Sequence, residues 1–283
     1  MTINEAELID FKFDEITVIV SSRDAMIYGL GLGFGADPLD KAQLQYVYED
    51  GLAVFPTMPV VLGSPGMWFA KAGLNWRKVV HGAQSLNIHL SLPLDEPLMA
   101  SSIIAGVYDK GPEKGVIIDV ERTIRLQNGE LAATMVATYV CRGDGGFGGT
   151  SLQPVDSWAL PECKPDAVID ISTLPQSALI YRLSGDVNPL HADPDAAKRL
   201  GFDRPILHGL CTFGLMGRAV LSAAGCDDPS ALRSLSGRFT RPIFPGETVQ
   251  VKLWLDGNYI VFEAYVPERE IKVFTAGRAK IIF

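Results

Sequence analysis

The sequence lacks the features of a chain directed to a membrane. It opens with MTINEAELIDFKF, where acidic residues come first and no basic segment or apolar run of a secretory signal is present. The most apolar stretch, residues 209–224, is interrupted by Arg218 and is too short to cross a bilayer. The closing residues AKIIF match neither a prenylation nor a peroxisomal address. We therefore expect a cytoplasmic protein with no membrane partner.

Positive charge and metal-binding patterns are also scarce. The 33 acidic and 25 basic residues give a net charge of -8, which disfavours nucleic acid as a partner. The cysteines form no C-x-x-C pair and show no regular spacing with the histidines, so we expect buried free thiols rather than a zinc or redox site. The sequence predicts no metal and no cofactor.

The composition is that of a globular chain with a break near its middle. With 283 residues, 47% of them hydrophobic, the chain can form one large core or two ordinary ones. The glycine-rich segment GDGGFGG, residues 143–149, precedes a polar, proline-bearing stretch without a clear period. We predict a first domain over residues 1–150, a linker over 151–167 and a second domain over 168–283.

Both halves repeat one order of elements, helices first and long strands after them. In the first half, Ser22 is expected to cap a helix over residues 23–28 that ends in a glycine series, with further turns at 41–48 and 59–72. The expected strands cover residues 77–81, 85–92, 98–109, 115–126 and 130–142, and Asn128-Gly129 predicts a hairpin. That glycine series opens no βαβ unit, so a dinucleotide site is not expected.

The second half predicts helices at residues 173–183, 193–200 and 209–224, followed by strands at 232–240, 247–256, 258–266 and 271–282. Asp256-Gly257-Asn258 is typical of a tight hairpin, and Gly225 suits a helix C-terminus. A long apolar helix followed by an antiparallel meander indicates a sheet wrapped around one helix. Because the order occurs twice, we predict an α+β double hot-dog.

Polar and helix-breaking residues concentrate between Tyr181 and Gly214. Asp186, Asn188 and His191 are separated by two and three positions, and Pro189 prevents a continuous helix upstream, so a turn is forced. Asp193 can then cap a helix with Pro194 at its first position. The acid and the imidazole therefore lie in a constrained turn. An isolated Asp/His pair of this kind would more often serve only as a turn and cap.

Gly209 begins the long apolar helix, directly after His208. The first N–H groups of a helix have no intrahelical acceptor, and that end of the helix favours negative charge. Without a side chain, Gly209 allows a substrate oxygen to approach, so its N–H is a candidate oxyanion donor. His208 itself is expected to be a structural residue. An acid, an imidazole and an oxyanion donor are what hydration of a conjugated thioester needs.

At these residues the sequence resembles the hydratase 2 family, the MaoC-like (R)-specific enoyl-CoA hydratases, including the hydratase 2 domain of type 2 peroxisomal multifunctional enzymes. The resemblance rests on LSGDVNPLH and HGL, and on VYED at 47–50, KVVHGAQ at 78–84, YDKG at 108–111, GGFGG at 145–149 and RFTRPIFPG at 238–246. It departs at Ala83, where an acid is usual in the eukaryotic proteins, which puts local CoA contacts in doubt.

The resemblance implies a reversible hydration of trans-2-enoyl-CoA to (3R)-3-hydroxyacyl-CoA, with acyl-CoA as substrate and a homodimer as the assembly. It assigns catalysis to Asp186 and His191, with Asn188 supporting them and Gly209 as oxyanion donor. It also implies a role for Glu49, and it places four further residues along the acyl-CoA site, namely His81, Gly82, Lys110 and Phe239. On their own, Glu49 and Lys110 would be solvated surface residues.

Three alternatives stay open at this point. The chain could dehydrate acyl groups carried by an acyl-carrier protein, or it could be a non-catalytic acyl-CoA-binding hot-dog subunit. Thioester hydrolysis on a related fold is the third, and it would release a free thiol. Acyl chain length, and a preference for fatty or steroid side chains, depend on a tunnel whose shape the sequence does not give.

Overall fold

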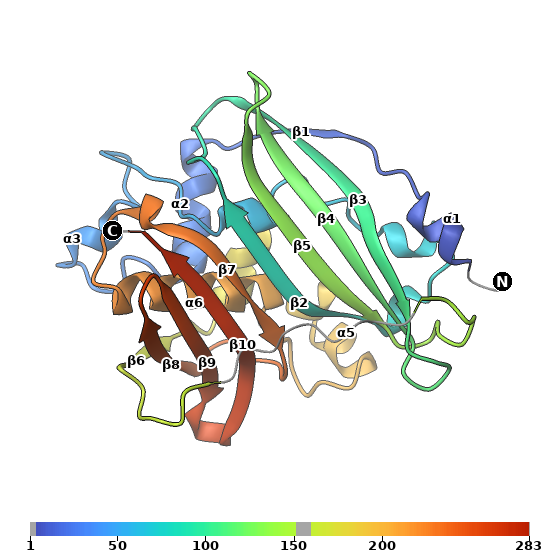
Figure 1. The fold of residues 1–283 in the computed structure, drawn as a ribbon. Coiled ribbons are helices and arrows are strands. Elements are labelled where there is room, and N and C mark those ends of the chain that lie inside the picture. Colours follow the sequence, from blue (N-terminus) through green and yellow to red (C-terminus); the bar gives the residue numbers. More distant parts are fainter. Residues whose placement is uncertain (1–3, 151–159, 283) are drawn as a thin grey trace.

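One antiparallel sheet organises the chain in this computed structural model, which describes residues 4–150 and 160–282. Its ten strands have the order β1-β3-β4-β5-β2-β7-β10-β9-β8-β6 (Figure 1). The first half, residues 4–150, supplies β1 Ile16–Ile19, β2 Val79–Ile88, β3 Pro97–Asp109, β4 Val116–Leu126 and β5 Leu131–Cys141. The second half, residues 160–282, supplies β6 Ala167–Ser172, β7 Leu232–Phe239, β8 Thr248–Asp256, β9 Tyr259–Val266 and β10 Ile271–Ile281.

Helix α6, Gly209–Ala223, is the core of the second half. Its residues are mostly small or apolar, and ten of its fifteen are buried against the sheet. Arg218 is the one charged residue of this helix. Its guanidinium donates to the Leu32 carbonyl and to the Gln43 side chain, and these two acceptors stabilise the charge. Figure 1 shows α6 lying behind the strands of this half. The predicted helix over 209–224 is confirmed.

The first half carries a shorter helix, α2, at Ser22–Gly31. Its cap is Ser21, whose side chain accepts from the Asp24 N–H while the Asp24 carboxylate accepts from the Ser21 N–H. The predicted cap at Ser22 was therefore wrong by one residue, because the reciprocal box requires an acid three positions after the cap. Helix α2 packs on α4, Ser177–Tyr181, from the second half, where Tyr28 and Tyr181 lie 5.7 Å apart.

Several predicted elements differ in extent. The strands predicted at 77–81 and 85–92 merge into the single strand β2, Val79–Ile88, which continues through a bulge between His81 and Ala83, whereas residues 77–78 belong to η3 and residues 89–92 lie outside the strand. The turns predicted at 41–48 and 59–72 shorten to α3 Lys41–Leu44, η1 Met58–Val61 and η2 Trp68–Ala70, with η3 at Trp76–Lys78. The helix predicted at 173–183 is reduced to α4 and η4 Arg182–Ser184. Strands β1 and β6 and helix α1, Glu5–Ile9, were not predicted.

The remaining elements follow the sequence closely. Helix α5, Pro194–Arg199, is capped by Asp193 and is followed by Gly201 in the left-handed region. Gly129 and Gly257 have positive φ angles in the two predicted hairpins. The other short elements are η5 Pro189–His191, η6 Pro229–Ala231 and η7 Pro267–Arg269. No helix in the described part of the chain is long and apolar enough to cross a membrane.

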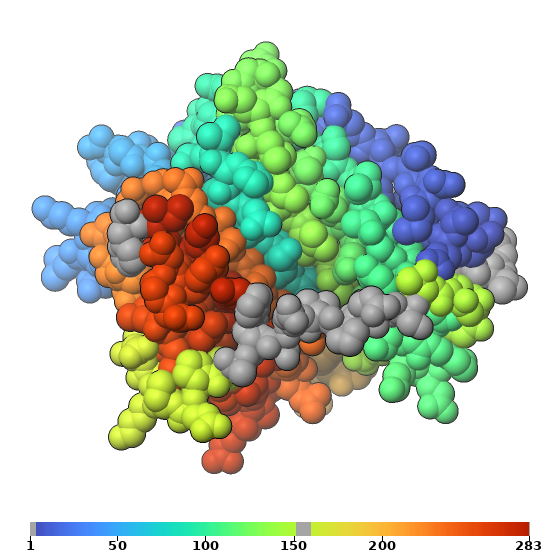
Figure 2. All heavy atoms as spheres, viewed as in Figure 1, coloured from blue at the N-terminus to red at the C-terminus, as the bar shows by residue number. Residues whose placement is uncertain are grey.

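Strands β2 and β7 join the two halves. They pair from Ala83 opposite Arg238 to Asn87 opposite Ser234. In Figure 2 the green strands of the first half and the orange to red strands of the second meet along one face. Of the linker predicted at 151–167, residues 151–159 lie outside the described residues, and the domain division stays a prediction.

Candidate active site

The turn from Asp186 to His191 is held by its own side chains. The Asp186 carboxylate accepts from the Asn188 N–H at 3.1 Å, and the Asn188 side chain accepts from the Leu190 N–H at 3.1 Å. Asn188 is thereby the cap of η5, the short helix that carries His191. These contacts are local, which is why the spacing of the three polar residues predicts the turn. Asn188 acts here on the position of His191.

His191 is buried, and its hydrogen bonding fixes its tautomer. The ring Nδ1 lies 2.8 Å from the Ile206 carbonyl oxygen, and because that oxygen can only accept, Nδ1 carries the proton. Burial lowers the pKa of His191, although the Ile206 hydrogen bond and the Asp186 charge oppose this shift. The ring is therefore neutral near pH 7, and Nε2 keeps a lone pair that can accept a proton.

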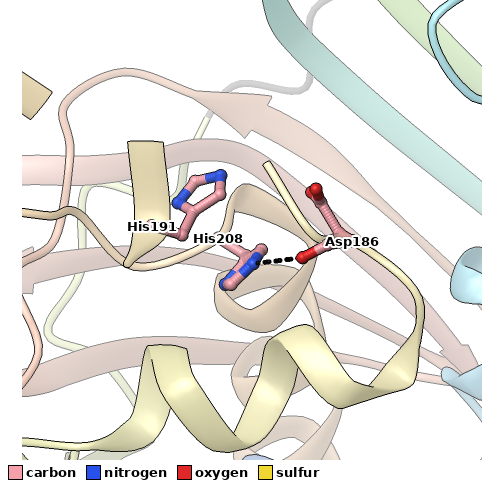
Figure 3. Close-up of side chains that lie close together, drawn as sticks. All are labelled: Asp186, His191 and His208. Atoms are coloured by element: carbon pink, nitrogen blue, oxygen red, sulfur yellow. Dashed lines mark hydrogen bonds between the residues drawn. The ribbon is translucent and has the colours of Figure 1, made fainter. Parts of the chain in front are cut away.

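His208 completes the cluster. Its ring stacks on His191 with centroids 3.8 Å apart, and its Nε2–H donates to the Asp186 carbonyl oxygen at 3.1 Å (Figure 3). Burial, followed by the neighbouring His191, lowers the pKa of His208 to about 4. One ligand-type atom from each of Asp186, His191 and His208 lies within 4.8 Å of the other two. The chain thus brings together three residues that are separated in sequence.

This carboxylate and two imidazoles are also groups that bind metals. Each ring donates one N–H to a backbone carbonyl, which fixes the tautomer and leaves the other ring nitrogen as an acceptor, an arrangement that suits both proton transfer and metal ligation. The expectation that the site needs no metal stays a prediction.

Gly209 lies at the first position of α6. His208, the cap residue, makes no side-chain capping bond, and within the described residues the Gly209 N–H has no acceptor. A Cβ added at Gly209 would lie 3.7 Å from the Phe239 ring, which is ordinary contact, and its φ is not in the left-handed region. Neither backbone nor packing therefore demands glycine here.

The segment before Gly209 is held by a backbone hydrogen bond to the RFTRPIFPG segment. The Leu207 N–H donates to the Ile243 carbonyl at 2.8 Å, within the RFTRPIFPG segment. Ile206 and His208, on either side of Leu207, hold His191 and Asp186 as described above. The segment over 205–208 therefore sets the positions of both the acid and the imidazole.

His81 on β2 and Phe239 on β7 lie where the two halves of the sheet meet. Their rings lie 5.1 Å apart, and the His81 ring lies 5.1 Å from Tyr139 as well. Burial lowers the pKa of His81 to about 4. Because Phe239 also borders Gly209, these two predicted substrate-site residues lie next to the candidate oxyanion donor. Gly82 is at the bulge beside them, where a Cβ would approach Val140 to 3.0 Å.

Glu49 and Lys110 are not brought to this cluster. Glu49 is exposed in a loop whose Gln45 donates to the Asp227 carbonyl, beyond the C-terminal end of α6. Since Gly209 begins that helix, its length separates the two regions by about 20 Å. Lys110 is exposed in the turn after β3, which lies three strands from β2 in the sheet. The roles that the resemblance implies for them stay predictions.

Sequence reasoning did not assign His208, Tyr139 or Arg122 to the site. His208 follows His191 by 17 positions, and only the fold shows that their rings stack. Tyr139 and Arg122 are on β5 and β4, where their side chains interrupt otherwise apolar inward positions. A polar residue inside such a run is the one signal that could have indicated them.

Two family models match the chain. The MFE-2 hydratase 2 N-terminal domain matches residues 19–143, and the MaoC like domain matches residues 157–275. Enoyl-CoA hydratase 2, peroxisomal, from Arabidopsis thaliana is 37% identical over 98% of this chain and 95% of its own length. The predicted resemblance is confirmed by these matches.

Solved structures show the same architecture. A MaoC-like dehydratase from Phytophthora capsici superposes with a TM-score of 0.86 at 30% identity, over 98% of both chains. A Mycobacterium tuberculosis protein described as a double hotdog fold superposes with a TM-score of 0.57 at 12% identity, over 95% of both chains, which bears on the fold alone. The predicted α+β double hot-dog is confirmed.

Proposed function

This chain belongs to the MaoC-like hydratase 2 family, and we propose that it adds water reversibly to trans-2-enoyl-CoA, giving (3R)-3-hydroxyacyl-CoA. The observation that carries the proposal is the proximity of Asp186 and a neutral His191, within 4.8 Å, beside the unpartnered N–H of Gly209. The relatives named as enoyl-CoA hydratase 2 support the substrate class.

One water can bridge the Asp186 carboxylate and His191. One carboxylate oxygen of Asp186 and one ring nitrogen of His191 lie within 4.8 Å of each other, a separation that one water can bridge at ordinary hydrogen-bond lengths. His191 Nε2 removes one proton from this water as the oxygen bonds to C3 of the substrate. The electron pair of the 2,3-double bond then moves towards C2 and the thioester oxygen.

Gly209 stabilises the charge that develops on the thioester oxygen. Its N–H points from the N-terminal end of α6, where the helix dipole favours negative charge. The Asp186 and His191 pair returns a proton to C2 on the same face, so that one water is added overall and the addition is syn. The reverse sequence is the dehydration. Asn188 and His208 position the two reacting residues.

The test is the loss of enoyl-thioester absorbance, with chiral analysis of the product. We expect (3R)-hydroxyacyl-CoA from the wild type, and a fall in kcat on the order of 100-fold or more in Asp186→Asn and His191→Ala. Asp195→Asn on the exposed face of α5 and His89→Ala on the surface are matched controls that keep full activity. Wild-type levels of turnover in both site variants would overturn the assignment.

The same assay separates the alternatives. Preference for acyl-carrier-protein thioesters over CoA thioesters would indicate the carrier-protein dehydratase. Release of free thiol would indicate hydrolysis, and CoA binding without turnover would indicate a non-catalytic subunit. The intact set of Asp186, His191 and Gly209 favours the hydratase over these.

The assembly and the compartment stay predictions. We propose a homodimer on family grounds, and light scattering of the purified chain would identify a monomer instead. The proposed cytoplasmic location can be tested by fractionation of the source cells, and recovery in an organelle would contradict it.

A further inference from the structure

Arg122 is an inward-facing cation in the first half with no carboxylate beside it. On β4 it follows the buried residues Ile118 and Val120 at the same two-residue spacing, and it is opposite the buried Met135 on β5. Among residues 4–150 and 160–282, no acidic side chain forms an ion pair with it. Inward positions of such a sheet ordinarily hold apolar residues, so a guanidinium here needs an explanation.

The contacts of Arg122 leave a buried donor without an acceptor. Its Nη2 donates to the Val60 carbonyl at 2.6 Å, and Nη2 lies 4.0 Å from the Met135 sulfur. Its Nε is buried and has no partner. A guanidinium has five N–H donors, whereas one backbone carbonyl needs a single donor. Anchoring Val60 therefore does not account for the cost of removing this charge from water.

The other unpartnered polar atoms of this half are of the same kind. Within residues 4–150, the buried side-chain polar atoms without a partner are Trp68 Nε1, His81 Nε2 and Arg122 Nε. All three are nitrogens, and the first and last can only donate. Trp68 and His81 each contact the Tyr139 ring, at 6.3 and 5.1 Å between centroids. Among residues 4–150, this inner face therefore has two buried donors, Trp68 Nε1 and Arg122 Nε, that no acceptor satisfies.

This donor-rich face continues from the candidate active site. Phe239 borders Gly209 and lies 5.1 Å from His81, whose ring is a further 5.1 Å from Tyr139. The charges of Arg122 and of Asp186 both affect the pKa values of His81 and Tyr139, as expected for groups facing one interior that continues to the candidate active site. Phe239, His81 and Tyr139 thus form a continuous series of ring contacts that leads from the candidate oxyanion donor into the first half.

We propose that the inner face of the first half binds an oxygen acceptor on the acyl tail, a carboxylate or a carbonyl distant from the thioester, with Arg122 as its donor. This inference rests on the proposed hydratase function and specifies its substrate class. A tail made only of hydrocarbon would enclose the guanidinium further and offer it no acceptor. An oxygenated tail supplies the missing acceptor, and a carboxylate also balances the charge.

The test compares three trans-2-enoyl-CoA substrates of equal chain length that end in a methyl group, a methyl ketone or a carboxylate. For the wild type, we expect kcat/KM to be on the order of tenfold higher for at least one oxygenated tail than for the methyl tail. In Arg122→Met this ratio should fall to near one. Arg122→Lys, which keeps the charge, should retain part of a carboxylate preference. Arg125→Met is the matched control, because Arg125 is exposed on the same strand and, among the described residues, its side chain donates to the Gly129 carbonyl of the hairpin alone.

The outcomes are distinguishable. Preference for the carboxylate or for the ketone identifies which oxygen source the site takes, and either supports the inference if Arg122→Met abolishes it. Turnover of all three tails at equal efficiency by the wild type overturns the inference and leaves the hydratase function intact. No turnover of these substrates or of short crotonyl-CoA would instead refute the proposed function. The wild-type comparison stands even if an Arg122 variant does not fold.

Discussion

The imidazole of His208 lies parallel to that of His191, with ring centroids 3.8 Å apart and an angle of 25° between the planes. The same His208 holds the backbone of Asp186 through its Nε2–H. One residue at the start of α6 therefore touches both members of the proposed dyad. Because His208 directly precedes Gly209, the N-terminal end of α6 positions the acid, the base and the oxyanion donor together.

Two replacements of His208 should distinguish the effect of its stacking on His191 from that of its hydrogen bond to Asp186. His208→Phe keeps an aromatic ring against His191 but loses the donor to Asp186, whereas His208→Gln keeps a donor and loses the stacked ring. We expect kcat to fall on the order of tenfold to 100-fold in each, since the dyad geometry is relaxed rather than removed. KM should change little, because His208 faces the dyad. Steady-state kinetics measure both parameters.

A rise in KM with unchanged kcat would show that His208 contacts the substrate instead. Cys226→Ser, a partly exposed position beyond the other end of α6, is the control for general effects on this part of the fold. Its kinetic constants should equal those of the wild type.

Gly209→Ala should increase stability while lowering activity. The added methyl group meets Phe239 only at 3.7 Å, and alanine favours a helix over glycine by up to about 1 kcal/mol, an upper limit at this first helical position. The methyl group would, however, occupy the space before the N–H that the thioester oxygen needs. We expect an unchanged or higher Tm with kcat/KM reduced at least on the order of tenfold.

Ser222→Ala, at an exposed position near the end of the same helix, should alter neither property substantially. If Gly209→Ala kept full activity, the oxyanion role of this N–H would be refuted. A large decrease in Tm would mean that the site packs more tightly than the 3.7 Å between an added Cβ and the Phe239 ring indicates.

Stability should fall as the pH is lowered from about 6.5 to about 4. Burial lowers the pKa values of His81 and His208 to about 4 in the folded chain, below the value of 6.5 for an unperturbed histidine. The unfolded chain then binds more protons in this window, so the free energy of unfolding decreases with falling pH, by up to about 3 kcal/mol per histidine. Above pH 6.5 this contribution is complete.

Urea unfolding at a series of pH values measures this slope. His81→Phe removes one of the titrating rings and should flatten the curve, whereas His89→Gln on the surface should leave it unchanged. An identical slope in His81→Phe and in the wild type would contradict the assignment of the buried, neutral ring.

The local parts of the site were accessible from sequence, and the tertiary parts were not. Asp186, Asn188 and Pro189 specify their turn through hydrogen bonds two residues apart, so the spacing alone is informative. The stacking of His208 on His191 depends on the path of the segment pinned by Leu207 and Ile243. No periodicity in the sequence encodes such a contact.

The fold was predictable where one face of an element is continuously apolar. Helix α6 and the long strands β3, β4 and β5 fall within this class. Gly82 led to the prediction of two strands where β2 is one, because a glycine bulge interrupts the alternation without ending the pairing. The sheet-edge strands β1 and β6 are short and half exposed, so their pattern is weak.

Asp109 should control the order of the glycine-rich loop that follows β5. Its Oδ1 accepts from the N–H groups of Gly111 and Gly146, and its Oδ2 accepts from that of Gly148, all at 2.8 Å. These hydrogen bonds, that of Gly146 first, lower the pKa of Asp109 to about 2. Because the folded-state pKa is below the ordinary one, the ionised carboxylate stabilises the loop at all pH values above about 4 and the effect is lost as the pH falls towards 2.

Asp109→Asn leaves one oxygen where two are needed and places an NH₂ group against a donor. We expect amide exchange at Gly146 and Gly148 to accelerate on the order of tenfold at pH 7, while exchange in α6 and the global Tm stay close to wild type. Asp144→Asn is the matched control, because within the described part of the chain the Asp144 carboxylate accepts from the Asn75 N–H alone, at the same corner. Unchanged exchange at both glycines would show that the loop is held by its other contacts, such as that of Thr150 with Glu5.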